Sequence, residues 1–164
     1  MATEPITLFA KSIDPVHAFR VLNEVSPKIQ VEGSEQNWTK AIVSMGFWPF
    51  KKQLLISHDP AYYSEPNWSV QMNGLRDYLS RFPDVPQRNR AMELTRQFAF
   101  SLGTIVDPDL GRNDYRLTII QILAKELGAV WFTPSSLRDH TGRILLGAKA
   151  SDIDREATWP SYAS

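Results

Sequence analysis

Short segments with strand character lie near both ends of this chain and apolar residues at a helical period lie between them, and this arrangement constrains the fold most strongly. The short segments with strand character are 6–11, 28–32, 38–45, 52–57, 130–133 and 143–146. Between residues 75 and 127 the apolar residues mostly recur every three or four positions instead. Strands from both ends of the chain are therefore expected to share one sheet, with helices supplied by the middle.

Helices are predicted from capping residues and apolar stripes. Asp14 followed by Pro15 suits an N-cap and the first helical position, so a helix is expected to begin there. Three further stripes run from Leu75 to Phe82, from Ala91 to Ile105 and from Leu117 to Leu127. The residues expected to form the helical core are Leu94, Phe98, Leu102, Ile120, Leu123 and Leu127.

These elements predict an α+β fold in a single domain, residues 1–164. The expected architecture is a single mixed or antiparallel sheet formed by N- and C-terminal strands, with about four helices packed mainly on one face. A chain of 164 residues that is 43% hydrophobic is large enough to bury one core.

Charge and cysteine content exclude several classes of function. Lys and Arg together number 18, as do Asp and Glu, so the neutral chain is expected to bind neither nucleic acid nor anionic membranes. No stretch approaches the roughly 18 apolar residues that a membrane span needs. The absence of cysteine excludes disulfides and thiol chemistry and favours a cytoplasmic setting. No cofactor-binding motif is present, and no cofactor is expected.

Two His–Asp pairs are the candidate residues for metal-assisted chemistry. His58 and Asp59 follow one predicted strand, while Asp139 and His140 precede another. If both strands lie in one sheet, two imidazoles and two carboxylates can meet at one edge and bind a divalent metal or share acid–base work. Alternatively, each aspartate makes only local hydrogen bonds in its own turn.

An aromatic, proline-containing loop at residues 58–68 is the candidate binding element. Tyr62, Tyr63 and Trp68 combine apolar rings with polar ends, which suits a partly wet recognition surface, and Trp48 and Phe50 lie nearby in sequence. The same residues are equally typical of a loop that plugs the edge of a core.

Four segments of the chain carry a resemblance to a known group of proteins. The segments are YYSEPNW, QMNGLRDYL, FAFSLGTIVDPD and GAVWFTPSSLRDHTGRIL. Together they resemble a group of small uncharacterised bacterial proteins that form a domain of unknown function, over roughly residues 6 to 150. The resemblance implies a bacterial cytosolic setting and transfers no site.

The leading functional hypothesis is a non-enzymatic binding or interaction protein of the immunity or adaptor kind, because every standard catalytic motif is absent. Its partner would be another protein or a small ligand. Exposed strands can also pair across a homodimer, which is a further possibility. The rival hypothesis is a small metal-assisted hydrolase built on His58, Asp59, Asp139 and His140.

Overall fold

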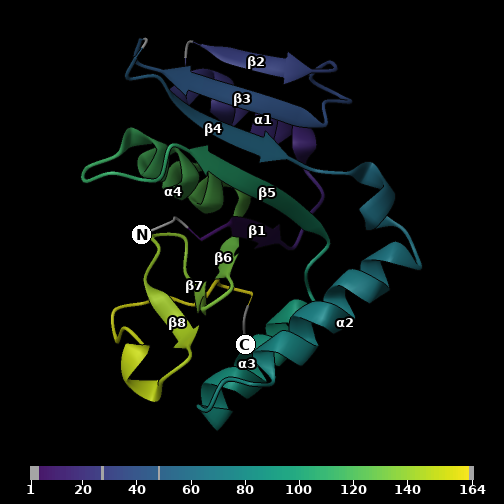
Figure 1. The fold of residues 1–164 in the computed structure, drawn as a ribbon. Helices are drawn as coiled ribbons and strands as arrows, with labels where there is room; N and C mark the ends of the chain where they lie inside the picture. Colours follow the sequence, from purple (N-terminus) through teal and green to yellow (C-terminus); the bar gives the residue numbers. More distant parts are fainter. Residues whose placement is uncertain (1–3, 27, 48, 163–164) are drawn as a thin grey trace.

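The computed structural model describes residues 4–26, 28–47 and 49–162, and within them eight strands form one sheet in the order β2-β3-β4-β5-β1-β6-β7-β8 (Figure 1). All seven pairs of neighbouring strands are antiparallel. The strands are β1 (Ile6–Ala10), β2 (Ile29–Glu32), β3 (Lys40–Met45), β4 (Lys52–Ser57), β5 (Phe100–Asp107), β6 (Val130–Thr133), β7 (Ser136–Arg138) and β8 (Ile144–Gly147).

The described chain also contains four α-helices and two short 3-10 helices. They are α1 (Pro15–Val25), η1 (Pro60–Tyr63), α2 (Asn67–Leu79), α3 (Val85–Thr95), α4 (Tyr115–Leu127) and η2 (Ala150–Asp152). None of the helices in this part of the chain has both the length and the apolar character needed to cross a membrane. The predicted α+β class, the single sheet with strands from both ends and the number of helices are confirmed.

Capping residues fix the ends of two helices, and the start at Asp14 is the one that the sequence predicts. The Asp14 carboxylate accepts a hydrogen bond from the His17 backbone N–H, and Pro15 occupies the first turn of α1. Gly128 ends α4 in the left-handed conformation, with φ of 61°, where a residue without Cβ avoids strain.

The helices divide between the two faces of the sheet, rather than gathering mainly on one. α1 and α4 pack against one face in a core cluster that includes Leu8 of β1 and Trp131 of β6. α2 and α3 belong to a second cluster that includes Phe9 of β1 and Val130 of β6. Because side chains alternate along a strand, adjacent residues of β1 and β6 reach opposite cores.

The segment 100–107 is a strand, β5, where the stripe from Ala91 to Ile105 predicts a continuous helix. α3 ends at Thr95, and β5 pairs with β4 on one side and β1 on the other. A run of β-branched residues, Thr104 to Val106, favours an extended backbone, and pairing on both sides outweighs the apolar spacing that fits a helix.

The residues predicted as the helical core are largely buried but do not share one surface. Leu94 and Phe98 lie in the cluster with α2, whereas Leu102 and the α4 residues Ile120 and Leu123 lie in the cluster with α1. Leu127 is only partly buried. The reason is β5, which interrupts the stripe from Ala91 to Ile105 and places Leu102 on the face of α1 and α4, while Leu94 and Phe98 lie on the other face.

Candidate functional site

The two His–Asp pairs lie at the same end of the sheet but not at one site. His58 follows β4 and His140 follows β7, and these strands run in the same direction because every neighbouring pair is antiparallel. β5, β1 and β6 lie between them, which places the strands about 19 Å apart at the usual strand spacing. Within the described residues no group of three or more His, Asp or Glu side chains is arranged to hold a metal ion.

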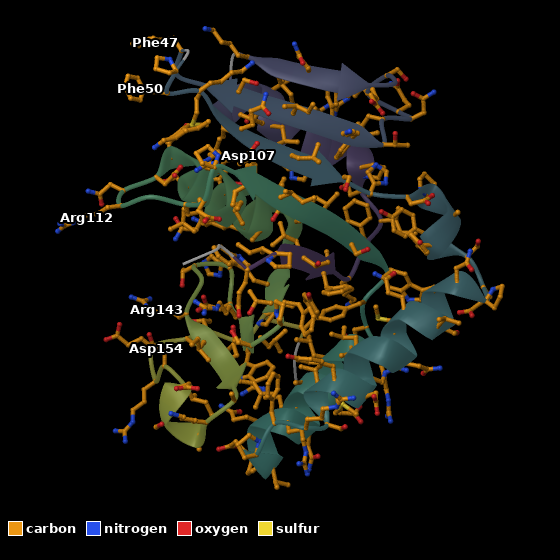
Figure 2. All side chains as sticks on the ribbon, viewed as in Figure 1. Phe47, Phe50, Asp107, Arg112, Arg143 and Asp154 are labelled. Atoms are coloured by element: carbon orange, nitrogen blue, oxygen red, sulfur yellow. The ribbon has the colours of Figure 1, made fainter. Side chains whose placement is uncertain are left out.

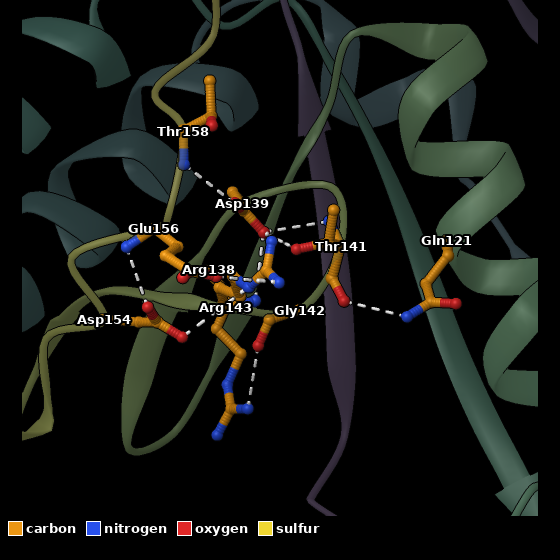
Figure 3. A network of polar contacts seen from close by, with 9 residues as sticks. All are labelled: Gln121, Arg138, Asp139, Thr141, Gly142, Arg143, Asp154, Glu156 and Thr158. Atoms are coloured by element: carbon orange, nitrogen blue, oxygen red, sulfur yellow. Dashed lines mark hydrogen bonds and ion pairs between the residues drawn. The ribbon is translucent and has the colours of Figure 1, made fainter.

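The Asp139 carboxylate is engaged in hydrogen bonds, most of them within the turn in which it lies (Figure 3). Its buried carboxylate accepts hydrogen bonds from the Thr141 N–H and hydroxyl, from the Arg143 N–H and from the Thr158 N–H, at 2.6 to 3.0 Å. Burial alone raises the pKa of Asp139, but these donors outweigh it and hold the pKa below its ordinary value. The carboxylate therefore ties the β7–β8 turn to the C-terminal segment.

Asp59 and His140 also have local roles. The Asp59 side chain accepts a hydrogen bond from the Ala61 N–H and caps η1. His140 lines a pocket of about 280 Å³ together with Trp159 and Tyr162, under the C-terminal segment. The structure thus places each aspartate in its own turn, where it accepts hydrogen bonds from nearby backbone N–H groups.

His58 is buried as one ring of an aromatic cluster. Its ring centroid lies 4.5 Å from that of Trp38, 5.8 Å from that of Tyr63 and 5.7 Å from that of Phe100. Neither ring nitrogen has a hydrogen-bond partner within the described chain. Burial lowers the pKa of His58, against weaker opposing effects from the Trp38 backbone and the Asp59 charge. The environment therefore favours a neutral, packed imidazole.

The three aromatic residues of the candidate binding loop face different surroundings. Tyr63 is partly buried, packs against the α1/α4 cluster and donates a hydrogen bond from its hydroxyl to the Ser101 carbonyl at 3.0 Å. Trp68 is partly buried against the other cluster. Tyr62 is 50% exposed. One ring of the three is therefore presented to solvent, while Trp48, named with this loop, lies outside the described residues.

Sequence reasoning missed a buried ion pair at the start of α4. Arg116 is fully buried, and its guanidinium donates to both oxygens of Asp114 and to the Gln53 and Asp109 carbonyls. The hydrogen bond from Arg116 is the main cause that lowers the pKa of Asp114. These contacts anchor the β5–α4 connection to β4, and the signal in sequence was only an arginine in an apolar helix.

A larger feature that sequence reasoning missed is an uncovered face on β2–β5. α1 and α4 cover the opposite face of these strands, and the strand residues in the α2/α3 cluster come from β1, β6, β7 and β8. Figure 1 shows β2 to β5 with α1 and α4 behind them. Toward this face α2 reaches only the start of β5, where the Gln71 side chain lies 3.4 Å from the Ser101 hydroxyl.

An apolar row crosses this face at right angles to the strands. Ile42 of β3 is paired with Leu55 of β4, and Leu55 is paired with Ile105 of β5. Gln30 of β2 continues the row beside Ile42. Ile42 and Leu55 are half-buried by their neighbours, and Ile105 is 58% exposed. We call these four residues the central row.

Polar residues flank the central row on both sides. One flanking row consists of Ser44, Gln53 and Asp107. The other consists of Glu32, Lys40 and Ser57 and ends at Gly103. An apolar stripe inside a polar rim is the usual form of a protein-binding surface. The uncovered face has this form and is the candidate functional site.

The β3–β4 hairpin extends this face with two exposed aromatic rings (Figure 2). Phe47 and Phe50 are 75% and 73% exposed, and their rings meet edge to face with centroids 6.5 Å apart. A pocket of about 520 Å³ lies between the hairpin and β2, and its lining includes Gly46, Lys51 and Gln30. The hairpin therefore presents more apolar area next to a cationic side chain.

The comparisons with known proteins identify no relative: no protein-family model, curated protein or solved structure shows significant similarity to this chain. The resemblance to small bacterial proteins gains no support from the family models. The fold and the uncovered face therefore define the protein only as an α+β protein whose antiparallel sheet has helices on one face of β2–β5 and, within the described residues, none on the other.

Proposed function

We propose that this chain is a non-enzymatic binding protein whose uncovered sheet face receives another protein. The single observation that supports the proposal is the central row. An aligned apolar stripe that includes a 58% exposed isoleucine is typical of a surface that another molecule buries. An immunity or adaptor protein, which acts by covering a surface of its partner, is the concrete form of the proposal. A cytosolic setting is part of it, argued from the absence of cysteine.

The chemistry of the face specifies the partner's surface. Ile42, Leu55 and Ile105 require aliphatic or aromatic side chains at the centre of the contact. Lys40 and Lys51 have no ion-pair partner within the described chain, so carboxylates of the partner are expected at the rim. Such rim charges mainly set the association rate and its dependence on salt.

Site-specific photo-crosslinking in the source cells tests this proposal. A photoreactive amino acid at position 105 should crosslink a defined protein, and the same amino acid at position 70 should not. Val70 is a suitable control because it is an exposed aliphatic residue, 69% accessible, on α2. Equal crosslinking at the two positions, or none at position 105, would count against the sheet face as the site.

A second candidate function is the binding of a small apolar ligand, favoured by a pocket between α2 and the sheet. The pocket measures about 370 Å³ and is lined mainly by apolar groups, among them Phe9, Tyr78 and Phe132. The buried Oε1 of Gln71, a lining residue, has no hydrogen-bond partner in the described chain. Gly74→Leu would fill this pocket, since an added Cβ meets nothing within 4 Å. If this variant no longer binds an apolar fluorescent probe and Val70→Leu binds it as the wild type does, the result would support the ligand site.

A further inference from the structure

The two edges of the sheet differ in how they are covered. At the β8 edge the chain turns back, and the Asp154 N–H donates to the Ile144 carbonyl at 2.9 Å. At the β2 edge no further segment of the described chain pairs with the strand, since β2 ends the strand order. An open edge presents unpaired backbone groups that can bind another strand.

The ladder between β2 and β3 determines which backbone groups face outward. The Ser44 N–H donates to the Lys28 carbonyl at 3.2 Å, so the backbone of Lys28 is directed toward β3. Backbone groups alternate sides along an antiparallel strand. The N–H and C=O groups of Ile29 and Val31 therefore point away from the sheet.

The side chains of β2 are self-complementary about Gln30. If a second β2 lies antiparallel with Gln30 opposite Gln30, Lys28 faces Glu32 of the other copy, and Ile29 faces Val31. The Ile29–Val31 pairs are then the ones that exchange backbone hydrogen bonds, which are the groups left free by β3. Lys28 and Glu32 are exposed and have no ion-pair partner within the described chain.

We propose that β2 pairs with β2 of a second copy of this chain, about a twofold axis at Gln30. Strand order, free backbone groups and opposite charges agree on this one register. The arrangement is isologous, as is usual for homodimers, and it joins two eight-stranded sheets into one. It also continues the central row across the axis, because Gln30 stands beside Ile42 in each copy.

This inference depends on the edge of the sheet and not on the proposed function of its face. Each can therefore fail alone: Ile105 lies on β5, three strand positions from β2. A variant at position 105 should leave dimerisation unchanged.

Charge reversal at the edge tests the dimer by sedimentation equilibrium. The wild-type protein should form a concentration-dependent dimer. Lys28→Glu places two like-charged pairs across the axis, as does Glu32→Lys, and each change should weaken dimerisation by about tenfold or more. The double variant, with both charges reversed, should recover the wild-type association. At concentrations low enough for the wild type to be monomeric, thermal melts of every variant should stay close to the wild type, because both residues are exposed.

Mixing the two single variants gives the sharpest result. A chain with Lys28→Glu carries two acidic residues at its edge and a chain with Glu32→Lys carries two basic ones, so the mixture should form a heterodimer although each alone is mainly monomeric. A monomeric wild-type protein at all concentrations would overturn the proposal and favour a strand of another protein at this edge. A dimer unaffected by either single change would overturn it in favour of a different interface.

Discussion

The Arg116 guanidinium holds the Asp114 carboxylate with two hydrogen bonds, 3.0 Å from Nε to Oδ1 and 2.9 Å from Nη2 to Oδ2, and both side chains are at least 99% buried. The pair lies beneath the Asp107–Asp114 connection and is joined to β4 through the Gln53 carbonyl. Removing Asp114 would leave the Arg116 charge buried without a carboxylate. Removing Arg116 would leave the buried Asp114 carboxylate with Lys52, 3.8 Å away, as its remaining ion-pair partner.

Arg116→Met should therefore lower the free energy of unfolding by about 3 to 5 kcal/mol, because a buried carboxylate without its partner is costly. Denaturant melts measure this loss. Arg112→Met, in the same connection but exposed, is the matched control and should change stability by less than about 0.5 kcal/mol. Similar small losses for both variants would show that the ion pair is not a structural anchor.

The buried His58 makes stability depend on pH in a predictable direction. Its pKa is lowered in the folded state from 6.5, so below that pH the unfolded chain binds a proton that the folded chain resists. The stability due to the neutral ring is complete above about pH 7 and should fall as the pH drops through the unfolded pKa. His58→Phe should flatten the loss of stability between about pH 7 and 5, measured by urea melts. An unchanged slope in His58→Phe would contradict the assignment.

Asp139 should act as a structural residue, and replacing it should lower the free energy of unfolding more than replacing Asp59. Asp139→Ala removes the acceptor of four hydrogen bonds and should cost about 3 kcal/mol or more, with faster amide exchange at Thr158. Asp59→Ala removes one capping bond and should cost about 1 kcal/mol. If added divalent metal stabilises the wild type but not these variants, a metal role would replace this account.

In the aromatic loop, Tyr63 should contribute to stability and Tyr62 should not. Tyr63→Ala should cost about 3 kcal/mol or more, since the ring stacks on His58 and its hydroxyl binds the Ser101 carbonyl. Tyr62→Ala should change the melting temperature little, because half of its side chain is exposed. Comparable losses in thermal melts would mean that Tyr62 is also part of the core.

Local chemistry explains which parts of the fold were predictable. Capping by Asp14 and the left-handed Gly128 act over a few residues, so their signals are complete in the sequence. β5 was not predictable in the same way, because Leu102 and Ile105 fit a helical stripe as well as a strand. Its extended state depends on pairing with β4 and β1.

The candidate site depends even more on tertiary structure. Ile42, Leu55 and Ile105 come from three strands and become neighbours only through the registers of β3, β4 and β5. Each looks in sequence like an ordinary core residue. Their exposure follows from the position of α2 and α3 over the other half of the sheet, which no local pattern encodes.

The most direct test of the uncovered face as a binding site is the affinity of the purified protein for the partner identified by crosslinking at position 105. Calorimetric titration should give a Kd at least about tenfold weaker for Ile105→Asp than for the wild type, because a carboxylate would be buried in the apolar centre of the contact. Val70→Asp should bind like the wild type. An unchanged Kd for Ile105→Asp, or equal weakening in both variants, would contradict the proposal that the central row is the binding surface.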